Sequence, residues 1–103
     1  MTSRSTGNAL RRLQAWYHAQ CDGDWEHGEG IHIGTLDNPG WALDVALTDT
    51  PLAGKPFAEL KTDYEHETEW LTCFLRDGKF MGRCGPEKLD EMIAVFLSWA
   101  EES

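Results

Sequence analysis

Apolar and polar residues alternate with a period of two on both sides of a short turn in the first half of the chain. The first run covers 31–35 and the second covers 41–48, and Asp37-Asn38-Pro39-Gly40 lies between them. A period of two places alternate side chains on one face of a strand, and Asn, Pro and Gly favour a turn between strands. The pattern therefore predicts an antiparallel β-hairpin with one buried face.

A second hairpin is expected from strands at 70–76 and 79–84. Asp77-Gly78 separates them, and both residue types tolerate the positive φ of a two-residue type I′ turn. With this turn, Arg76 pairs with Lys79 and Phe74 pairs with Met81 on one face. The opposite face carries the expected core residues Leu71, Cys73, Leu75, Phe80 and Cys84.

Two amphipathic helices are expected to flank these strands. The first begins at Asn8, a good N-cap, and ends near Cys21; its apolar positions are Leu10, Leu13, Trp16 and Tyr17. The second opens at Gly85-Pro86, with Pro at the first helical position. Its apolar positions are Leu89, Met92, Ile93, Phe96, Leu97 and Ala100. With a weaker strand at 57–64, the order predicts an α+β fold: an antiparallel sheet of four or five strands carrying both helices.

The length of 103 residues is sufficient for one domain, which we place at 8–103 after a disordered tail at 1–7. No apolar run is long enough to cross a bilayer, and the start of the chain lacks the apolar region of a secretory signal. The three cysteines form no CxxC pair, which argues against a disulfide framework and a closed zinc site. We therefore expect a cytoplasmic protein.

Acidic residues outnumber basic ones by 18 to 9, which gives a formal net charge of −9. This sign disfavours nucleic acid and anionic membranes as partners, because neutralising phosphate requires Lys and Arg. It favours a protein with a basic surface, although solubility alone would also explain an acidic composition.

The densest polar cluster, Cys21-Asp22-Gly23-Asp24-Trp25-Glu26-His27, falls at the start of a predicted loop over 22–30. Asp22 and Asp24 either contact a partner or cap turns by accepting backbone N–H bonds. Trp25 either plugs the end of the sheet or contacts a partner.

The same segment could serve a small metal-dependent enzyme through Asp22, Asp24, Glu26 and His27. The run does not continue as a calcium-binding loop, however, and no further Cys or His stands at a recognised zinc spacing. Cys21 is a poor candidate nucleophile, since a helix C-terminus raises the pKa of a thiol. We expect no enzyme and no cofactor.

A run of acids follows the connection that is expected over 48–56 between the hairpins. It comprises Glu59, Asp63, Glu65, Glu67 and Glu69, offset only by Lys61. Such a run either steers a basic partner or is a solvated edge that discourages aggregation of sheets. The hairpin face with Trp70, Phe74 and Met81 is either covered by the first helix or exposed as part of an oligomerisation module.

Several motifs together resemble the immunity protein 53 family of bacterial polymorphic toxin systems. They are Trp16-Tyr17, the segment 21–27, Gly30, the segment 35–41 (TLDNPGW), Trp70, Phe80, Gly82 and the segment 96–100 (FLSWA). The resemblance implies a small α+β protein that binds and neutralises a cognate toxin inside the producing cell, without a reaction. One departure is Gly34, which interrupts the first strand and suggests a bulge or a close approach.

The family carries no interface that can be transferred residue by residue, so the candidate partner-binding residues come from the charge and loop patterns. They are Asp22, Asp24, Trp25, Glu26, His27, Glu59, Asp63, Glu65 and Glu67.

Overall fold

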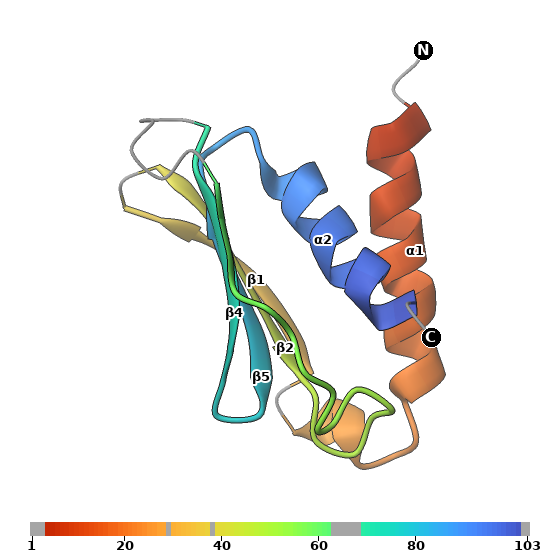
Figure 1. Ribbon diagram of the computed structural model, residues 1–103. Helices are drawn as coiled ribbons and strands as arrows, with labels where there is room; N and C mark the ends of the chain where they lie inside the picture. The colour runs from red at the N-terminus through yellow and green to blue at the C-terminus, as the bar shows by residue number, and fades with distance from the viewer. Residues whose placement is uncertain (1–3, 29, 38, 63–68, 102–103) are drawn as a thin grey trace.

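The protein is an antiparallel five-stranded sheet with two helices on one side of it (Figure 1). The computed structural model describes residues 4–28, 30–37, 39–62 and 69–101, with side chains from Asn8 onward. The elements are α1 (Arg4–Gln20), the 3-10 turn η1 (Trp25–His27), β1 (Ile31–Leu36), β2 (Gly40–Ala46), β3 (Leu60–Thr62), β4 (Leu71–Arg76), β5 (Lys79–Cys84) and α2 (Leu89–Glu101). The strand order is β1-β2-β5-β4-β3. The expected α+β fold is confirmed.

Both hairpins form with the expected pairing. In the second, Asp77 and Gly78 have φ values of 53° and 76°, and Phe74 lies opposite Met81. In the first, the ladder between β1 and β2 continues without a break through Gly34. A Cβ atom at Gly34 would meet nothing within 4 Å. The expectation of a bulge or a close approach at Gly34 was therefore wrong.

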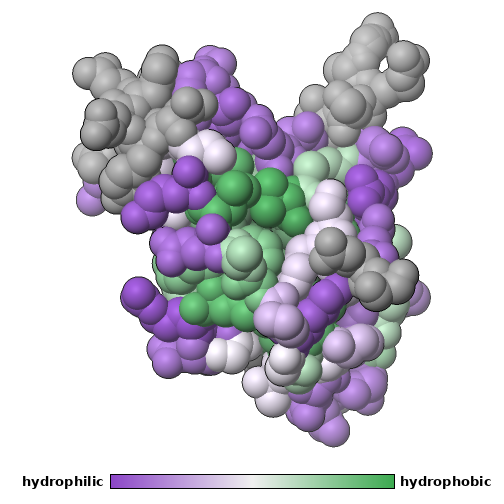
Figure 2. Space-filling model, in the orientation of Figure 1, coloured by the Kyte–Doolittle hydropathy of each residue, from purple (hydrophilic) through white to green (hydrophobic). Residues whose placement is uncertain are grey.

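The core lies between the sheet and α2. Its fully buried members include Leu43 and Val45 of β2, Phe80 of β5, and Phe96 and Leu97 of α2. Four of the five core residues expected from the second hairpin are buried, whereas Leu75 is 36% exposed. Figure 2 shows apolar side chains at the centre of this view, where the sheet and the helices meet. The helices thus cover one face of the sheet.

The buried face of α1 differs from the expected one. Ala9 and Leu13 are buried, and the ring of Trp16 packs edge-on against Phe96 with centroids 5.0 Å apart. Leu10 and Tyr17, expected on the apolar face, are 48% and 39% exposed. The reason is that α1 packs mainly on α2, so the contact is a narrow stripe at i, i+4 and i+7.

The ends of both helices also differ from expectation. The first begins at Arg4, four residues before Asn8, and residues 1–3 of the expected tail lie outside the described residues. The last begins at Leu89 and not at Pro86. Pro86 lies in a turn in which the N–H of Lys88 donates to the carbonyl of Gly85 at 3.2 Å. Residues 85–88 therefore form a turn, and the helical hydrogen-bonding pattern begins only after it.

The sheet face turned away from the helices is polar around a small apolar centre. Phe74 and Met81 are half-buried there and are not covered by α1, so of the two alternatives for this face the first is excluded, and a role in oligomerisation stays a prediction. The guanidinium of Arg76 lies over the ring of Phe74 at 5.1 Å, and Arg83 donates to Asp44 at 2.8 Å. Charged side chains therefore screen the apolar ones on this face.

β3 is shorter than the strand expected over 57–64. Phe57 precedes it and packs edge-on against Phe80 and Trp99, with centroids 5.3 Å from each. The last residues of the expected strand, 63–64, lie outside the described part of the chain. Phe57 therefore packs against the core, and pairing with β4 begins only at Leu60.

Candidate partner-binding site

The segment after α1 is held in shape by two of its own carboxylates. Asp22 Oδ1 accepts hydrogen bonds from the backbone N–H groups of Asp24 and Trp25, at 2.9 and 3.0 Å. The Glu26 carboxylate reaches back and accepts from the N–H groups of Asp22 and Gly23, at 2.9 and 2.8 Å. This reciprocal arrangement resembles a capping box with one extra residue, and it satisfies four backbone donors over residues 22–25, just before and at the start of η1. The turn needs Gly23, whose φ is +97°.

These hydrogen bonds also shift the ionisation of both carboxyl groups. The backbone N–H of Trp25, followed by that of Asp24, holds the pKa of Asp22 below its ordinary value. Backbone N–H groups likewise lower the pKa of Glu26, its own first and then those of Asp22 and Gly23. Donors that stabilise the charged form lower the pKa of an acid. Both carboxylates are therefore occupied by the loop itself.

Trp25 joins this loop to the rest of the fold. Its ring is 5% exposed and packs against Trp16 and Tyr17, with centroids 5.8 and 5.5 Å away. Its indole N–H donates to the carbonyl of Ala46 at the end of β2. Of the two interpretations left open for Trp25, the structure shows the one in which the ring plugs the end of the sheet.

The remaining members of the segment face solvent. Asp24 and His27 are exposed, and Asp24 makes no side-chain cap bond to η1. Asp24 lines a hollow of about 310 Å³, which we call the acidic hollow; its other lining residues include Asp49, Asp77, Lys79 and Trp25. Asp49 and Asp77 adopt positive φ values of 68° and 53°, which non-glycine residues rarely do. Three acidic residues far apart in sequence thus line one hollow beside the buried Trp25.

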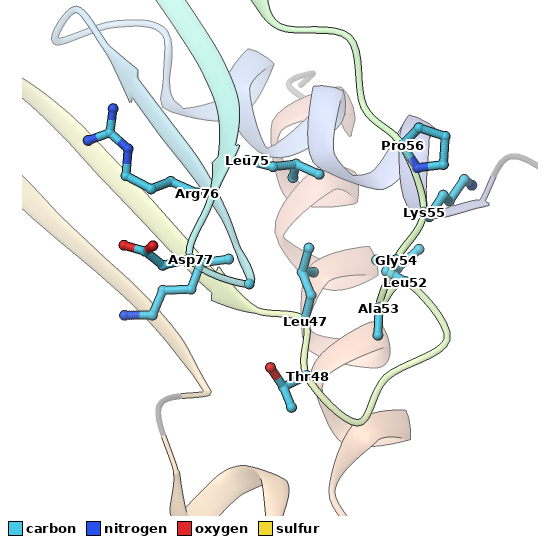
Figure 3. A pocket seen from close by; sticks show the side chains of 12 residues that line it. Leu47, Thr48, Leu52, Ala53, Gly54, Lys55, Pro56, Leu75, Arg76 and Asp77 are labelled. Atoms are coloured by element: carbon cyan, nitrogen blue, oxygen red, sulfur yellow. The ribbon is translucent and has the colours of Figure 1, made fainter.

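A second hollow adjoins the acidic one. It has a volume of about 500 Å³ and shares Thr48, Asp77, Gly78 and Lys79 with it. Figure 3 shows Leu47, Leu52 and Leu75 around its interior, with Asp77 at one side. This explains the exposure of Leu75, because that side chain lines the hollow rather than the core. One end of the sheet therefore presents a hollow with an apolar interior, whose lining also includes Lys55, Arg76 and Lys79, next to the acidic hollow.

Glu59, the other sequence-derived candidate that the structure describes, does not join this surface. Glu59 is exposed and lies 3.9 Å from Lys61 Nζ, in a separate hollow of about 290 Å³ with Phe74 and Arg76. Asp63, Glu65 and Glu67 lie outside the described residues. For these three, partner binding stays a prediction.

Sequence reasoning missed Asp49 and Asp77 as candidates. Asp77 was recognised only as a turn residue, and Asp49 only as part of a connection. The expected antiparallel pairing could have identified them. Because β1 pairs antiparallel with β2, and β5 pairs antiparallel with both β2 and β4, β1 starts at the end of the sheet where β2 and β4 finish. The loop before β1, the connection after β2 and the turn after β4 must therefore be neighbours.

The surroundings of two of the three cysteines disfavour a reactive thiolate. Cys21 is half-buried, and its Sγ donates to the carbonyl of Tyr17 at 3.3 Å. Cys73 and Cys84 are buried, and this burial raises the pKa of the Cys73 thiol to about 12 and that of Cys84 to about 11. Thiols with a raised pKa are poor nucleophiles at neutral pH, because the thiolate is the reactive form.

Across the described ranges, no three His, Cys, Asp or Glu side chains are grouped so as to hold a metal ion. Neither α1 nor α2 has the length and apolar character needed to cross a bilayer.

The fold and this sheet end define a class: a small α+β protein with an acidic hollow and an apolar-centred hollow side by side at the loop end of its sheet. The chain matches the model of the family described as immunity protein 53 over residues 10–101. It therefore belongs to the immunity protein 53 family. No curated protein and no solved structure matches it.

Proposed function

We propose that this immunity protein neutralises a cognate toxin in the cytoplasm by binding it, without catalysis. Membership of the family supports the toxin as the kind of partner. The use of Asp22 and Glu26 as internal caps favours binding over a metal-dependent reaction at that segment. The binding surface we propose is the sheet end that carries the acidic hollow and the apolar hollow beside it.

The observation that carries this proposal is the convergence of Asp24, Asp49 and Asp77 around one hollow. A net charge of −9 attracts a basic partner from a distance, and three exposed carboxylates at one place give that attraction a direction. The neighbouring apolar hollow supplies area that loses water on contact. A toxin that places basic side chains opposite the acidic hollow and an apolar side chain opposite the second hollow is the complementary partner.

Co-expression with the toxin domain encoded beside this gene tests the function. The wild-type chain should restore growth of cells that make the toxin, and the purified proteins should form a complex. Failure of the folded wild-type chain both to protect and to bind would overturn the proposal.

A charge-matched pair of variants tests the surface. Asp24→Asn, Asp49→Asn and Asp77→Asn together remove three charges from the acidic hollow. The control removes three charges from exposed acids of the C-terminal region that line neither hollow: Glu87→Gln, Glu91→Gln and Glu101→Gln. We expect the first triple variant to slow association about tenfold or more and the control to change it much less. Equal effects would show that only the overall charge matters.

A further inference from the structure

The two edges of the sheet are built differently. β3, at one edge, is three residues long and carries Lys61. β1, at the other edge, is six residues long and contains no Lys, Arg, Asp, Glu or Pro. Natural proteins protect an edge by making it short or by placing Lys or Pro on it. β3 has that protection and β1 does not.

The backbone of β1 offers regularly spaced hydrogen-bonding groups along this edge. The N–H of Ala46 donates to the carbonyl of Gly30 at 2.9 Å, which makes that pair a hydrogen-bonded one. In an antiparallel ladder the bonded and non-bonded pairs alternate, so the pairs of β2 with Ile31, Ile33 and Thr35 are non-bonded. The N–H and C=O groups of these three residues therefore point away from β2.

This edge is open to solvent in the part of the chain that the structure describes. Residues 32–35 are exposed, and Ile33 is 40% exposed. The open space around Gly34 agrees with this. The edge also begins close to the proposed binding surface, since the segment 21–28 leads through Gly30 into β1.

We propose that β1 receives an extended strand of the toxin, which adds to the sheet as a sixth strand beside Ile31, Ile33 and Thr35. The inference rests on the proposed function and adds the mode of binding. Strand addition draws affinity from main-chain hydrogen bonds, and alternate side chains give specificity. The side chains of Ile31 and Ile33 share the sheet face of Val45 and Leu43, so the incoming strand places its apolar residues on that face.

Charge selects a basic partner over a second copy of this chain. Acidic residues flank the uncharged strand, with Asp24 before it and Asp37 directly after it. Antiparallel pairing of two copies would bring the end of one β1 next to the start of the other, and so acids next to acids. Two chains of net charge −9 repel each other, whereas a strand flanked by Lys or Arg is attracted at both ends.

Replacing Thr35 tests this mode of binding with little change to the free protein. Thr35→Pro removes an N–H that points outward and leaves the ladder with β2 intact. An edge strand tolerates Pro at a position whose N–H faces solvent. Thr35→Ala is the control, because it truncates the same exposed side chain and keeps the N–H. We expect Thr35→Pro to weaken binding of the purified toxin domain about tenfold or more, and Thr35→Ala to bind like wild type.

Amide hydrogen exchange on the wild-type chain gives a readout that needs no variant. In the free protein, the N–H groups of Ile31, Ile33 and Thr35 should exchange faster than those of His32 and Gly34. In the complex with the toxin domain, the three fast groups should become protected. Their continued fast exchange in the complex, or equal binding by folded Thr35→Pro, would overturn strand addition while the proposed function stood.

Two further outcomes complete the test. Absence of any complex with the wild-type chain would overturn the proposed function and this inference with it. Sedimentation of the free protein as a dimer that Thr35→Pro dissociates would assign the edge to a second copy and overturn the toxin strand as its occupant.

Discussion

The indole N–H of Trp25 donates a hydrogen bond to the carbonyl oxygen of Ala46 across 3.2 Å. This bond fastens the segment that follows α1 to the end of β2, where the chain leaves the sheet. The acidic hollow is built around it, because Asp24 precedes Trp25 and Thr48 and Asp49 follow Ala46 closely. Trp25 thus holds together the loops that carry the proposed binding surface.

Trp25→Ala is expected to lower the free energy of unfolding by about 3–5 kcal/mol, the range for truncating a buried aromatic side chain. Trp25→Phe should cost less, because a ring still fills the site while one hydrogen bond worth about 1 kcal/mol is lost. Urea unfolding measures both. Asp24→Ala is the control: its side chain is exposed and caps nothing, so its effect should stay within about 0.5 kcal/mol. An equally large loss for Asp24→Ala would contradict this division between the two neighbours.

The carboxylates of Asp22 and Glu26 should make stability depend on pH. The pKa of each is lowered in the folded protein, so each stabilises the fold above its unfolded pKa, and that contribution is lost as the pH falls through the folded value. We therefore expect the wild-type urea midpoint to fall between about pH 5 and about pH 2. Asp22→Asn should show a smaller fall, so the gap between the two proteins should narrow in acid. A gap that stays constant would show that Asp22 does not contribute through its charge.

Thiol reactivity should separate the three cysteines. The pKa of Cys73 is raised to about 12 and that of Cys84 to about 11, mainly by burial, whereas Cys21 is half-buried near the end of α1. In a colorimetric thiol titration of the native protein, one group should react quickly, and all three should react in denaturant. Cys21→Ser should remove the fast group. Fast reaction of that variant would show that the sheet opens readily around Cys73 or Cys84.

The elements of the fold were predictable from the sequence because local signals agreed with the tertiary structure. Alternation at 41–47 and the pair Asp77-Gly78 each determine a register, and the structure has both. The exposure of Leu10 and Tyr17 was not predictable, because periodicity identifies an apolar side of a helix but not how much of it a neighbour covers. α1 packs on α2, which is narrower than a sheet.

The candidate site was only partly predictable. The segment 21–27 was identified from composition, but composition could not show that Asp22 and Glu26 bind their own backbone while Asp24 does not. That difference depends on the geometry of one turn. Asp49 and Asp77 join Asp24 only because three connections meet at one end of the sheet, and separation in sequence gives no measure of that distance.

Two glycines of the first hairpin should respond in opposite directions to the same change. Gly34 lies on the open edge strand, and a Cβ atom there meets nothing, so Gly34→Ala should be neutral or stabilise by up to about 1 kcal/mol through lower entropy of the unfolded chain. A Cβ atom at Gly40 would clash with the backbone oxygen of Cys84, which a side-chain rotation cannot relieve. Gly40→Ala should therefore destabilise by about 1–3 kcal/mol, the range for forced overpacking. Thermal and urea unfolding of the two variants check this. A loss at Gly34 as large as that at Gly40 would show that the β1 edge is covered in solution, which would also remove the basis for strand addition there.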